Sequence, residues 1–128
     1  MAKFTEKDFK KMVDEGISKI KKLDIEEILK KEKELNEKFE TKRDLKGHIN
    51  DFKLMLSLLK DYYDGNYKKI PWYSIVAISV TLIYVINPYD IIPDFIPVIG
   101  YVDDLTVFVY CLKLIKSDFN DYEEWKRI

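Results

Sequence analysis

The chain has 128 residues, of which 47% are hydrophobic and 35% charged, so its composition excludes a disordered protein and is sufficient for a hydrophobic core. A net charge of −1 provides no general attraction for nucleic acid, and a nucleic-acid partner is therefore not expected. The single cysteine, Cys111, excludes an intrachain disulfide, and its apolar surroundings predict a small buried side chain rather than a catalytic thiol.

The first predicted helix begins after Thr5. Asp8 follows three residues later, which is the spacing of a capping box with its acidic group in the positive first turn. Apolar residues then recur at intervals of three and four along one stripe: Phe9, Val13, Ile17 and Ile20. The pattern predicts an amphipathic helix with this stripe against the core.

A second helix is predicted from Ile25 to Phe39, opened by Asp24 in the same capping pattern. It has few apolar residues, and Glu–Lys pairs four residues apart stabilise it in the favourable order: Glu26–Lys30, Glu27–Lys31 and Glu34–Lys38. Such a helix is typical of the charged outside of a bundle, and the alternative is a solvated arm or a strip that binds a partner.

A third helix is predicted from Leu45 to Tyr63, with a stronger apolar stripe. Gly65 is expected to end it, because glycine readily adopts the left-handed conformation found after many helix ends.

The next segment, residues 70–89, carries no charge. Pro71 is expected at the first helical position and Pro88 after the last, which leaves a hydrophobic helix at about 72–86. A final helix is predicted from residue 105 to the C-terminus as one continuous stripe: Leu105, Phe108, Leu112, Ile115, Phe119 and Tyr122.

Helical periodicity throughout predicts an all-α protein, a helical bundle of about five helices around a central hydrophobic helix at about 72–86. A corner rich in proline and aspartate, at 87–104, joins that helix to the last one. We expect a single domain over 1–128, with charged amphipathic helices in 1–64 and a hydrophobic helical segment in 65–128.

The uncharged run has a second interpretation, since a helix that is hydrophobic on all sides is either a buried core helix or a membrane span. Residues 70–89 reach the length of a span only when the prolines at both ends are included. Lys68 and Lys69 before the run, and aromatic residues such as Trp72 near its ends, suit a membrane interface with a cytoplasmic N-terminus. Both alternatives stay open.

The corner contains four carboxylates: Asp90, Asp94, Asp103 and Asp104. Carboxylate oxygens are the ligands of Mg²⁺ and Ca²⁺, so a divalent-cation site is one hypothesis, although otherwise we expect no cofactor. The alternative is that Asp103 or Asp104 caps the last helix while the other two stabilise turns around the prolines. No basic residue is near the corner in the sequence, which argues against an anion site or a reaction centre.

These residues carry a resemblance. The stretch NPYDIIPDFIPVIGYVDD is similar to the motif of the YkvA-like family, and the resemblance extends over roughly residues 54–116. The residues of the motif are Pro88, Asp90, Pro93, Asp94, Pro97, Gly100, Asp103 and Asp104. The family is a bacterial one of unknown function whose members are often predicted to be membrane proteins. The resemblance therefore favours membrane association, and it implies no activity or ligand.

Three functions fit the sequence. The first is a non-enzymatic protein at the cytoplasmic face of the membrane, docked through 70–89 and binding a protein partner through its charged N-terminal helices. The second is a soluble cytoplasmic interaction protein, such as an inhibitor or an immunity factor. The third is a metal-binding switch or enzyme at the four aspartates. The sequence predicts no oligomeric state.

Overall fold

Helices form nearly all regular structure in the computed structural model of the chain, which describes residues 4–86 and 103–127. Within these ranges there is no strand, and the all-α class is confirmed. The elements are α1 (Glu6–Gly16), α2 (Lys22–Lys30), α3 (Glu32–Thr41), the 3₁₀ turn η1 (Lys46–His48), α4 (Ile49–Asp64), α5 (Trp72–Ile86), α6 (Asp104–Leu114) and α7 (Lys116–Arg127).

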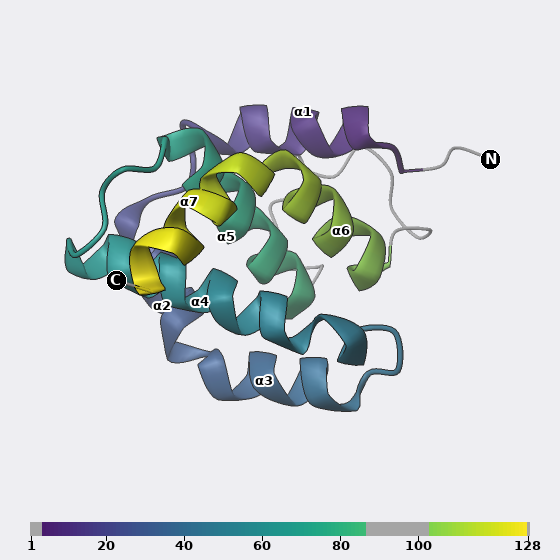
Figure 1. Ribbon diagram of the computed structural model, residues 1–128. Coiled ribbons are helices and arrows are strands. Elements are labelled where there is room, and N and C mark those ends of the chain that lie inside the picture. The colour runs from purple at the N-terminus through teal and green to yellow at the C-terminus, as the bar shows by residue number, and fades with distance from the viewer. Residues whose placement is uncertain (1–3, 87–102, 128) are drawn as a thin grey trace.

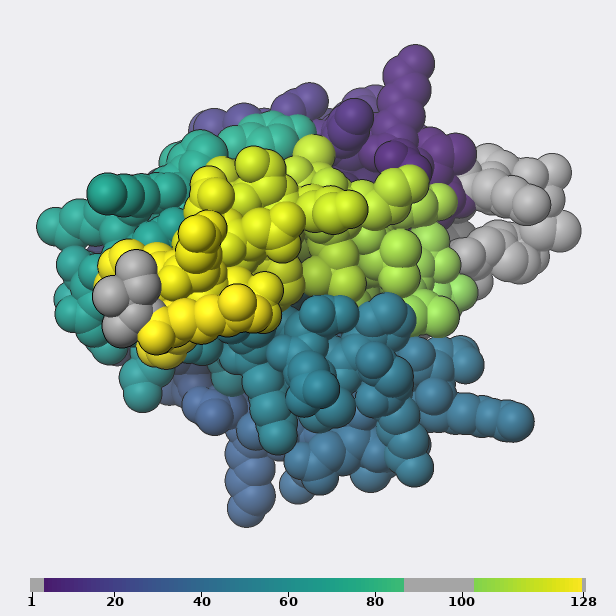
Figure 2. Space-filling model, viewed as in Figure 1, coloured from purple at the N-terminus to yellow at the C-terminus, as the bar shows by residue number. Residues whose placement is uncertain are grey.

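The centre of the bundle is α5, which contacts α1, α2, α3, α4 and α6 (Figure 1). Every residue from Ser74 to Leu82 is buried, as are Tyr84 and Val85. In the space-filling view α1, α4 and the α6–α7 pair cover most of α5 on this face (Figure 2). The predicted central hydrophobic helix at 72–86 is confirmed, because its apolar side chains form the core of the bundle.

Both polar side chains deep inside α5 are satisfied within the helix. Ser79 Oγ donates to the carbonyl oxygen of Ile75, and Thr81 Oγ1 donates to that of Ala77, each over 2.8 Å. A buried hydroxyl without such a partner would destabilise the core. The hydroxyl groups are therefore compatible with an interior position and indicate no site by themselves.

The first helix confirms the capping box but not the whole apolar stripe. Thr5 accepts from the backbone N–H of Asp8, whose carboxylate accepts in turn from the N–H of Thr5. Ile17, predicted to face the core, is 40% exposed, because α1 ends at Gly16 and the chain turns there. A Cβ at Gly16 would lie 2.9 Å from Cγ1 of Val76, so a glycine lets α1 approach α5 closely.

The predicted helix over residues 25–39 is wrong in two respects. It begins earlier, at Lys22, and Asp24 is its third residue, accepting over 2.7 Å from the N–H of Lys21. It also breaks at Lys31, whose φ of −101° and ψ of 20° are not helical, so that α2 and α3 are separate helices. Their apolar side chains are buried in the bundle: Ile25, Ile28, Leu35 and Phe39. These charged helices are thus outer helices of the bundle rather than a solvated arm.

The third predicted helix begins later than expected, since a 3₁₀ turn precedes α4. It ends as predicted at Gly65, which has a φ of 83°. The carbonyl oxygen of Asp61 then accepts from the N–H groups of Asn66 and Tyr67, over 2.8 and 3.1 Å. Pro71 was predicted to be the first helical residue, but α5 begins one residue later, at Trp72, so Pro71 precedes the helix. Its carbonyl oxygen accepts from the N–H of Ser74.

The C-terminal stripe is confirmed in part, while the single helix predicted for it is not. Phe108, Ile115, Phe119 and Tyr122 are buried, and Leu105 and Leu112 are partly buried. The helix is interrupted at Ile115, where φ is −96° and ψ is 8°, so α6 and α7 are distinct. About five helices were predicted, and the difference arises from these two interruptions, at residues 31 and 115.

Candidate functional site

A lysine of α3 holds the C-terminal end of α5. Lys38 Nζ donates to the carbonyl oxygens of Val85 and Ile86, over 2.5 and 2.8 Å. Carbonyl groups in the last turn of a helix have no partner within the helix, and the partial negative charge there attracts a cation. Lys38 therefore caps α5 from a neighbouring helix, at the point where the Pro/Asp-rich corner begins.

A second lysine, at the C-cap of α3, contacts the start of α6. Lys42 Nζ lies 2.6 Å from Oδ2 of Asp104, a carboxylate whose side chain is only 11% exposed. Asp103 Oδ1 accepts from the N–H of Thr106 over 2.7 Å, and Asp103 is the N-cap of α6. The hypothesis that one of these two aspartates caps the last helix is confirmed for Asp103.

Lys38 lies in α3 and Lys42 is the extended residue that follows its last residue, Thr41, so the end of α3 contacts both the end of α5 and the start of α6. The expectation that no basic residue is near the corner is therefore wrong. The structure brings two lysines to its flanks from far away in the sequence. The spacing of the two lysines gives no signal of this in the sequence, because Lys42 follows the end of α3 and does not share a helix face with Lys38.

The cation hypothesis stays a prediction. Six residues of the motif lie outside the described residues: Pro88, Asp90, Pro93, Asp94, Pro97 and Gly100. Asp103 and Asp104 each have a partner, Thr106 for Asp103 and Lys42 for Asp104. Among residues 4–86 and 103–127, no three side chains of His, Cys, Asp or Glu gather in a way that could hold a metal ion.

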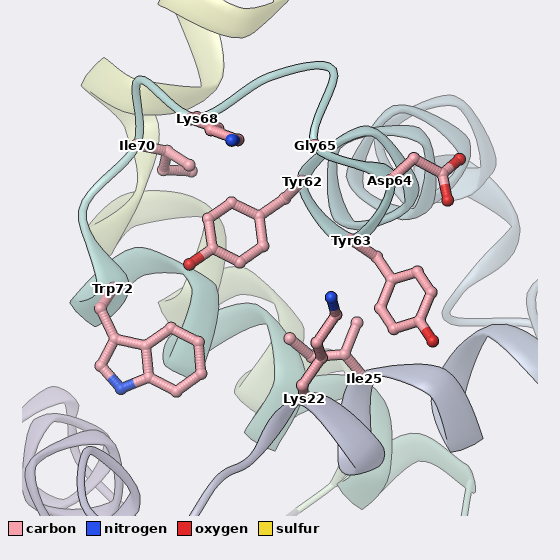
Figure 3. A pocket seen from close by; sticks show the side chains of 9 residues that line it. All are labelled: Lys22, Ile25, Tyr62, Tyr63, Asp64, Gly65, Lys68, Ile70 and Trp72. Carbon is pink, nitrogen blue, oxygen red and sulfur yellow. The ribbon is translucent and has the colours of Figure 1, made fainter.

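The other end of α5 borders a pocket of about 440 Å³ that sequence reasoning missed. It is lined by Lys22, Ile25, Tyr62, Tyr63, Asp64, Gly65, Lys68, Ile70 and Trp72, from α2, α4, α5 and the connection before α5 (Figure 3). The Lys22 ammonium lies 5.1 Å from the centroid of the Tyr63 ring. Figure 3 shows the Asp64 carboxylate pointing away from Lys22. The pocket combines two ammonium groups with aromatic walls.

Trp72 connects this pocket to the turn between α1 and α2. Its Nε1 donates to the carbonyl oxygen of Ile17 over 2.9 Å, and its ring centroid lies 6.4 Å from that of Tyr62. The backbone of Ile17, a residue with an exposed side chain, thus contacts a residue of the pocket wall. The first turn of α2, with Lys22 and Leu23, lies at the same corner.

Similarity to known proteins is concentrated around α5 and the corner that follows it. A family model described as "Protein of unknown function (DUF1232)" matches residues 74–110. The chain is also 32% identical over 79 residues to the uncharacterized membrane protein YkvA of Bacillus subtilis (strain 168), a match that covers 62% of this chain and 72% of that protein. The chain belongs to the YkvA-like family. No solved structure matches it significantly.

The YkvA-like family model covers only part of what surrounds α5. Residues 74–110 include most of α5, the corner and the first part of α6. Lys38 and Lys42, which hold the corner, lie outside that range, as do the residues that line the pocket. Among the helices described in this YkvA-like chain, none has both the length and the hydropathy that a membrane span requires.

A buried polar network joins α4 to α7 in this YkvA-like chain. Asp61 Oδ2 accepts from the hydroxyl of Tyr122 over 2.5 Å and from Lys126 Nζ over 2.9 Å. The Tyr122 oxygen also lies 2.6 Å from Oγ of Ser57. Burial raises the pKa of the Asp61 carboxyl, but the hydrogen bonds from Tyr122 and Lys126 outweigh burial and hold the pKa below its ordinary value. The network therefore connects α7 to α4.

The single cysteine is fully buried, as predicted. Burial raises the pKa of the Cys111 thiol to about 12, with a small opposing effect from Thr81. A thiol is nucleophilic as the thiolate, and at neutral pH this one stays protonated inside the core. Cys111 therefore acts as a core side chain.

Proposed function

We propose that this chain is a non-enzymatic helical protein that associates with the cytoplasmic face of the bacterial membrane through its surface. The observation that carries the proposal is the similarity to a protein named as a membrane protein, at 32% identity. The side chains of α5 from Ser74 to Leu82 are buried in the core, so in this fold they are not available to lipid. Contact with the bilayer would then come from exposed residues rather than from insertion of 70–89.

Fractionation of the untagged protein from its native host tests the proposal. We expect it to sediment with membranes at low salt and to be released by carbonate or by high salt, as a peripheral protein is. Complete recovery in the low-salt supernatant would contradict it and would favour the alternative of a soluble interaction protein, such as an inhibitor or an immunity factor.

The state of the thiol supports a function without covalent catalysis. Cys111 is buried, and its pKa of about 12 leaves almost no thiolate near pH 8. We expect the native protein to react with a thiol reagent much more slowly than the urea-unfolded protein at the same pH. Equal labelling rates in the two states would contradict the buried, protonated thiol.

The proposal places a protein partner on the charged N-terminal helices, at a hollow beside α2. A hollow of about 250 Å³ between α2 and α5 is lined by Asp24, Glu27, Ile28, Lys31, Ile83 and Ile86. Ile83 and Ile86 are only partly buried there. Partly exposed isoleucines with charged groups around them resemble the centre and rim of a protein interface.

A photo-reactive residue placed at the exposed position Glu27 tests this part of the proposal in living cells. The matched control is the same residue at Glu124, which is exposed on α7. We expect a discrete cross-linked protein from position 27 and none from position 124. Identical patterns from both positions would contradict a partner surface on α2.

A further inference from the structure

We infer that the end of the bundle where α5 begins is a docking surface for a bilayer that contains anionic phospholipids. The inference rests on the proposed membrane association and adds the surface and the lipid chemistry. We call this surface the basic end; it consists of Ile17, Lys21, Lys22, Leu23, Lys68, Lys69 and Trp72.

Exposed large hydrophobic side chains are rare in this protein. Among residues 4–86 and 103–127 they are Ile17, 40% exposed, Leu23, 63% exposed, and Trp125, 38% exposed. Two of the three flank the turn between α1 and α2. Since α1 stops at Gly16, Ile17 is directed out of the core stripe, and Leu23 stands in the exposed first turn of α2. Apolar side chains in such a position can enter the boundary between headgroups and acyl chains.

The same surface has cations without acidic partners. Lys21, Lys22, Lys68 and Lys69 are exposed, and none of them forms an ion pair with a described residue. The Asp24 carboxylate accepts from the N–H of Lys21 at the start of α2, and that of Asp64, which also lines the pocket, points away from Lys22 (Figure 3). Lysines near an anionic leaflet are attracted to it, by an energy that falls within a Debye length.

The pocket supplies a place for a lipid headgroup. The ammonium groups of Lys22 and Lys68 line it, and so do the rings of Tyr62 and Trp72 (Figure 3). Ammonium groups bind phosphate oxygens, and tyrosine and tryptophan favour the boundary between water and acyl chains. The indole is held in place by its hydrogen bond to Ile17, which joins the pocket to the exposed apolar side chains.

The exposed apolar side chains favour a bilayer over a small free anion as the ligand of this surface. A free phosphate would contact the lysines of the pocket and would leave Leu23 and Ile17 in water. A bilayer surface would contact both the cations and the apolar side chains, because they lie at one corner of the bundle. This combination of charge and exposed apolar area fits an anionic membrane.

Co-sedimentation of the purified full chain with lipid vesicles tests the inference. The vesicles contain phosphatidylcholine alone, or phosphatidylcholine and phosphatidylglycerol in equal parts. We expect sedimentation with the mixed vesicles and none with phosphatidylcholine alone, and we expect the bound fraction to fall as salt rises. Equal binding to both vesicles would overturn the role of the anionic lipid.

Variants locate the surface. We expect Lys22→Glu with Lys68→Glu to weaken binding to the mixed vesicles by at least about tenfold, and Leu23→Ser to weaken it by a smaller factor. The matched control is Lys33→Glu with Lys53→Glu, which makes the same change in net charge at exposed positions of α3 and α4. Circular dichroism and urea unfolding verify that every variant is folded.

Each outcome separates the surface from the proposed function. Equal losses in both double variants, or no loss in Lys22→Glu with Lys68→Glu, would overturn the basic end as the docking surface. Native protein that sediments with cell membranes but not with the mixed vesicles would overturn this inference and leave the proposed membrane association intact. Failure to sediment with either would contradict both.

Discussion

The two ends of α5 use lysine in different ways. At the C-terminal end, Lys38 donates to backbone carbonyl groups and Lys42 pairs with Asp104, so both ammonium groups have partners inside the protein. At the N-terminal end, Lys22 and Lys68 line an open pocket and form no ion pair among the described residues. The first arrangement stabilises the fold, whereas the second leaves positive charge available to a partner.

The aromatic residues near the two ends of α5 also differ, in how deeply they are buried. Under the C-terminal end, Phe39 stacks on Phe52 with ring centroids 4.3 Å apart and meets Phe108 edge-on at 5.0 Å. All three rings are fully buried. At the N-terminal end the aromatic residues Tyr62 and Trp72 are only partly buried. Substitutions at the two ends are therefore expected to separate stability from binding.

The largest expected effect on stability is that of Phe39→Ala. Removal of this buried ring creates a cavity and is expected to lower the free energy of unfolding by about 3–5 kcal/mol. Urea unfolding followed by circular dichroism measures it, with Leu23→Ala at the other end as the control, expected to change stability by under about 0.5 kcal/mol. Comparable losses of stability in the two variants would contradict the proposed difference between the two ends of α5.

Lys38→Met is expected to cost about 2 kcal/mol of stability. Methionine keeps much of the aliphatic stem but leaves the carbonyl groups of Val85 and Ile86 without their donor. Lys30→Met is the matched control, because its exposed ammonium pairs only with the exposed carboxylate of Glu27, and a loss of at most about 1 kcal/mol is expected. Urea unfolding of both variants distinguishes them, and a harmless Lys38→Met would remove the proposed cap.

Asp61→Asn is expected to lower stability by about 1.5 kcal/mol at neutral pH, because the charged acceptor of Tyr122 and Lys126 is lost. In the folded protein the pKa of Asp61 is lowered, so the carboxylate stabilises the fold above its unfolded pKa, about 3.9. That stabilisation is lost as the pH falls through the lower folded-state pKa.

Unfolding in urea across the acid range measures this effect of Asp61. The variant is expected to lose less stability than the wild-type protein as the pH falls below about 4. Parallel curves for the two proteins would show that Asp61 does not contribute. Asp64→Asn, at an exposed carboxylate of the same helix, is the control.

The smallest expected effect on stability is that of Lys22→Glu with Lys68→Glu, at under about 0.5 kcal/mol. Both side chains are exposed and form no ion pair with a described residue, and the cation–π contact of Lys22 with Tyr63 is at the surface, where it contributes little. The midpoint of urea unfolding measures it. A large destabilisation would mean that the basic end, like the opposite end, serves the fold.

Local signals in the sequence located much of the fold. Thr5 with Asp8 and the left-handed Gly65 mark helix ends through contacts within a few residues, and the uncharged run locates the core helix at 72–86. The interruptions at Lys31 and Ile115 have no such signal. Neither residue is glycine or proline, and tertiary contacts can override local helix propensity at such positions.

The candidate sites depend on contacts between distant parts of the chain. Lys38 reaches the end of α5 across 47 residues of sequence, and Lys42 reaches Asp104 across 62. The pocket likewise combines Lys22 with Trp72, from α2 and α5. Only the cap at Asp103 was accessible from the sequence, because its partner, Thr106, is three residues away.

The capping of α5 by Lys38 has a consequence for proteins that share only the family segment. Residues 74–110 contain the acceptors, Val85 and Ile86, but not the donor, which comes from α3. In a protein that carries this segment in a different setting, another side chain or water is expected to satisfy these carbonyl groups. The family segment therefore contains the acceptors of this cap, and the residue that donates to them can differ in sequence from one protein to the next.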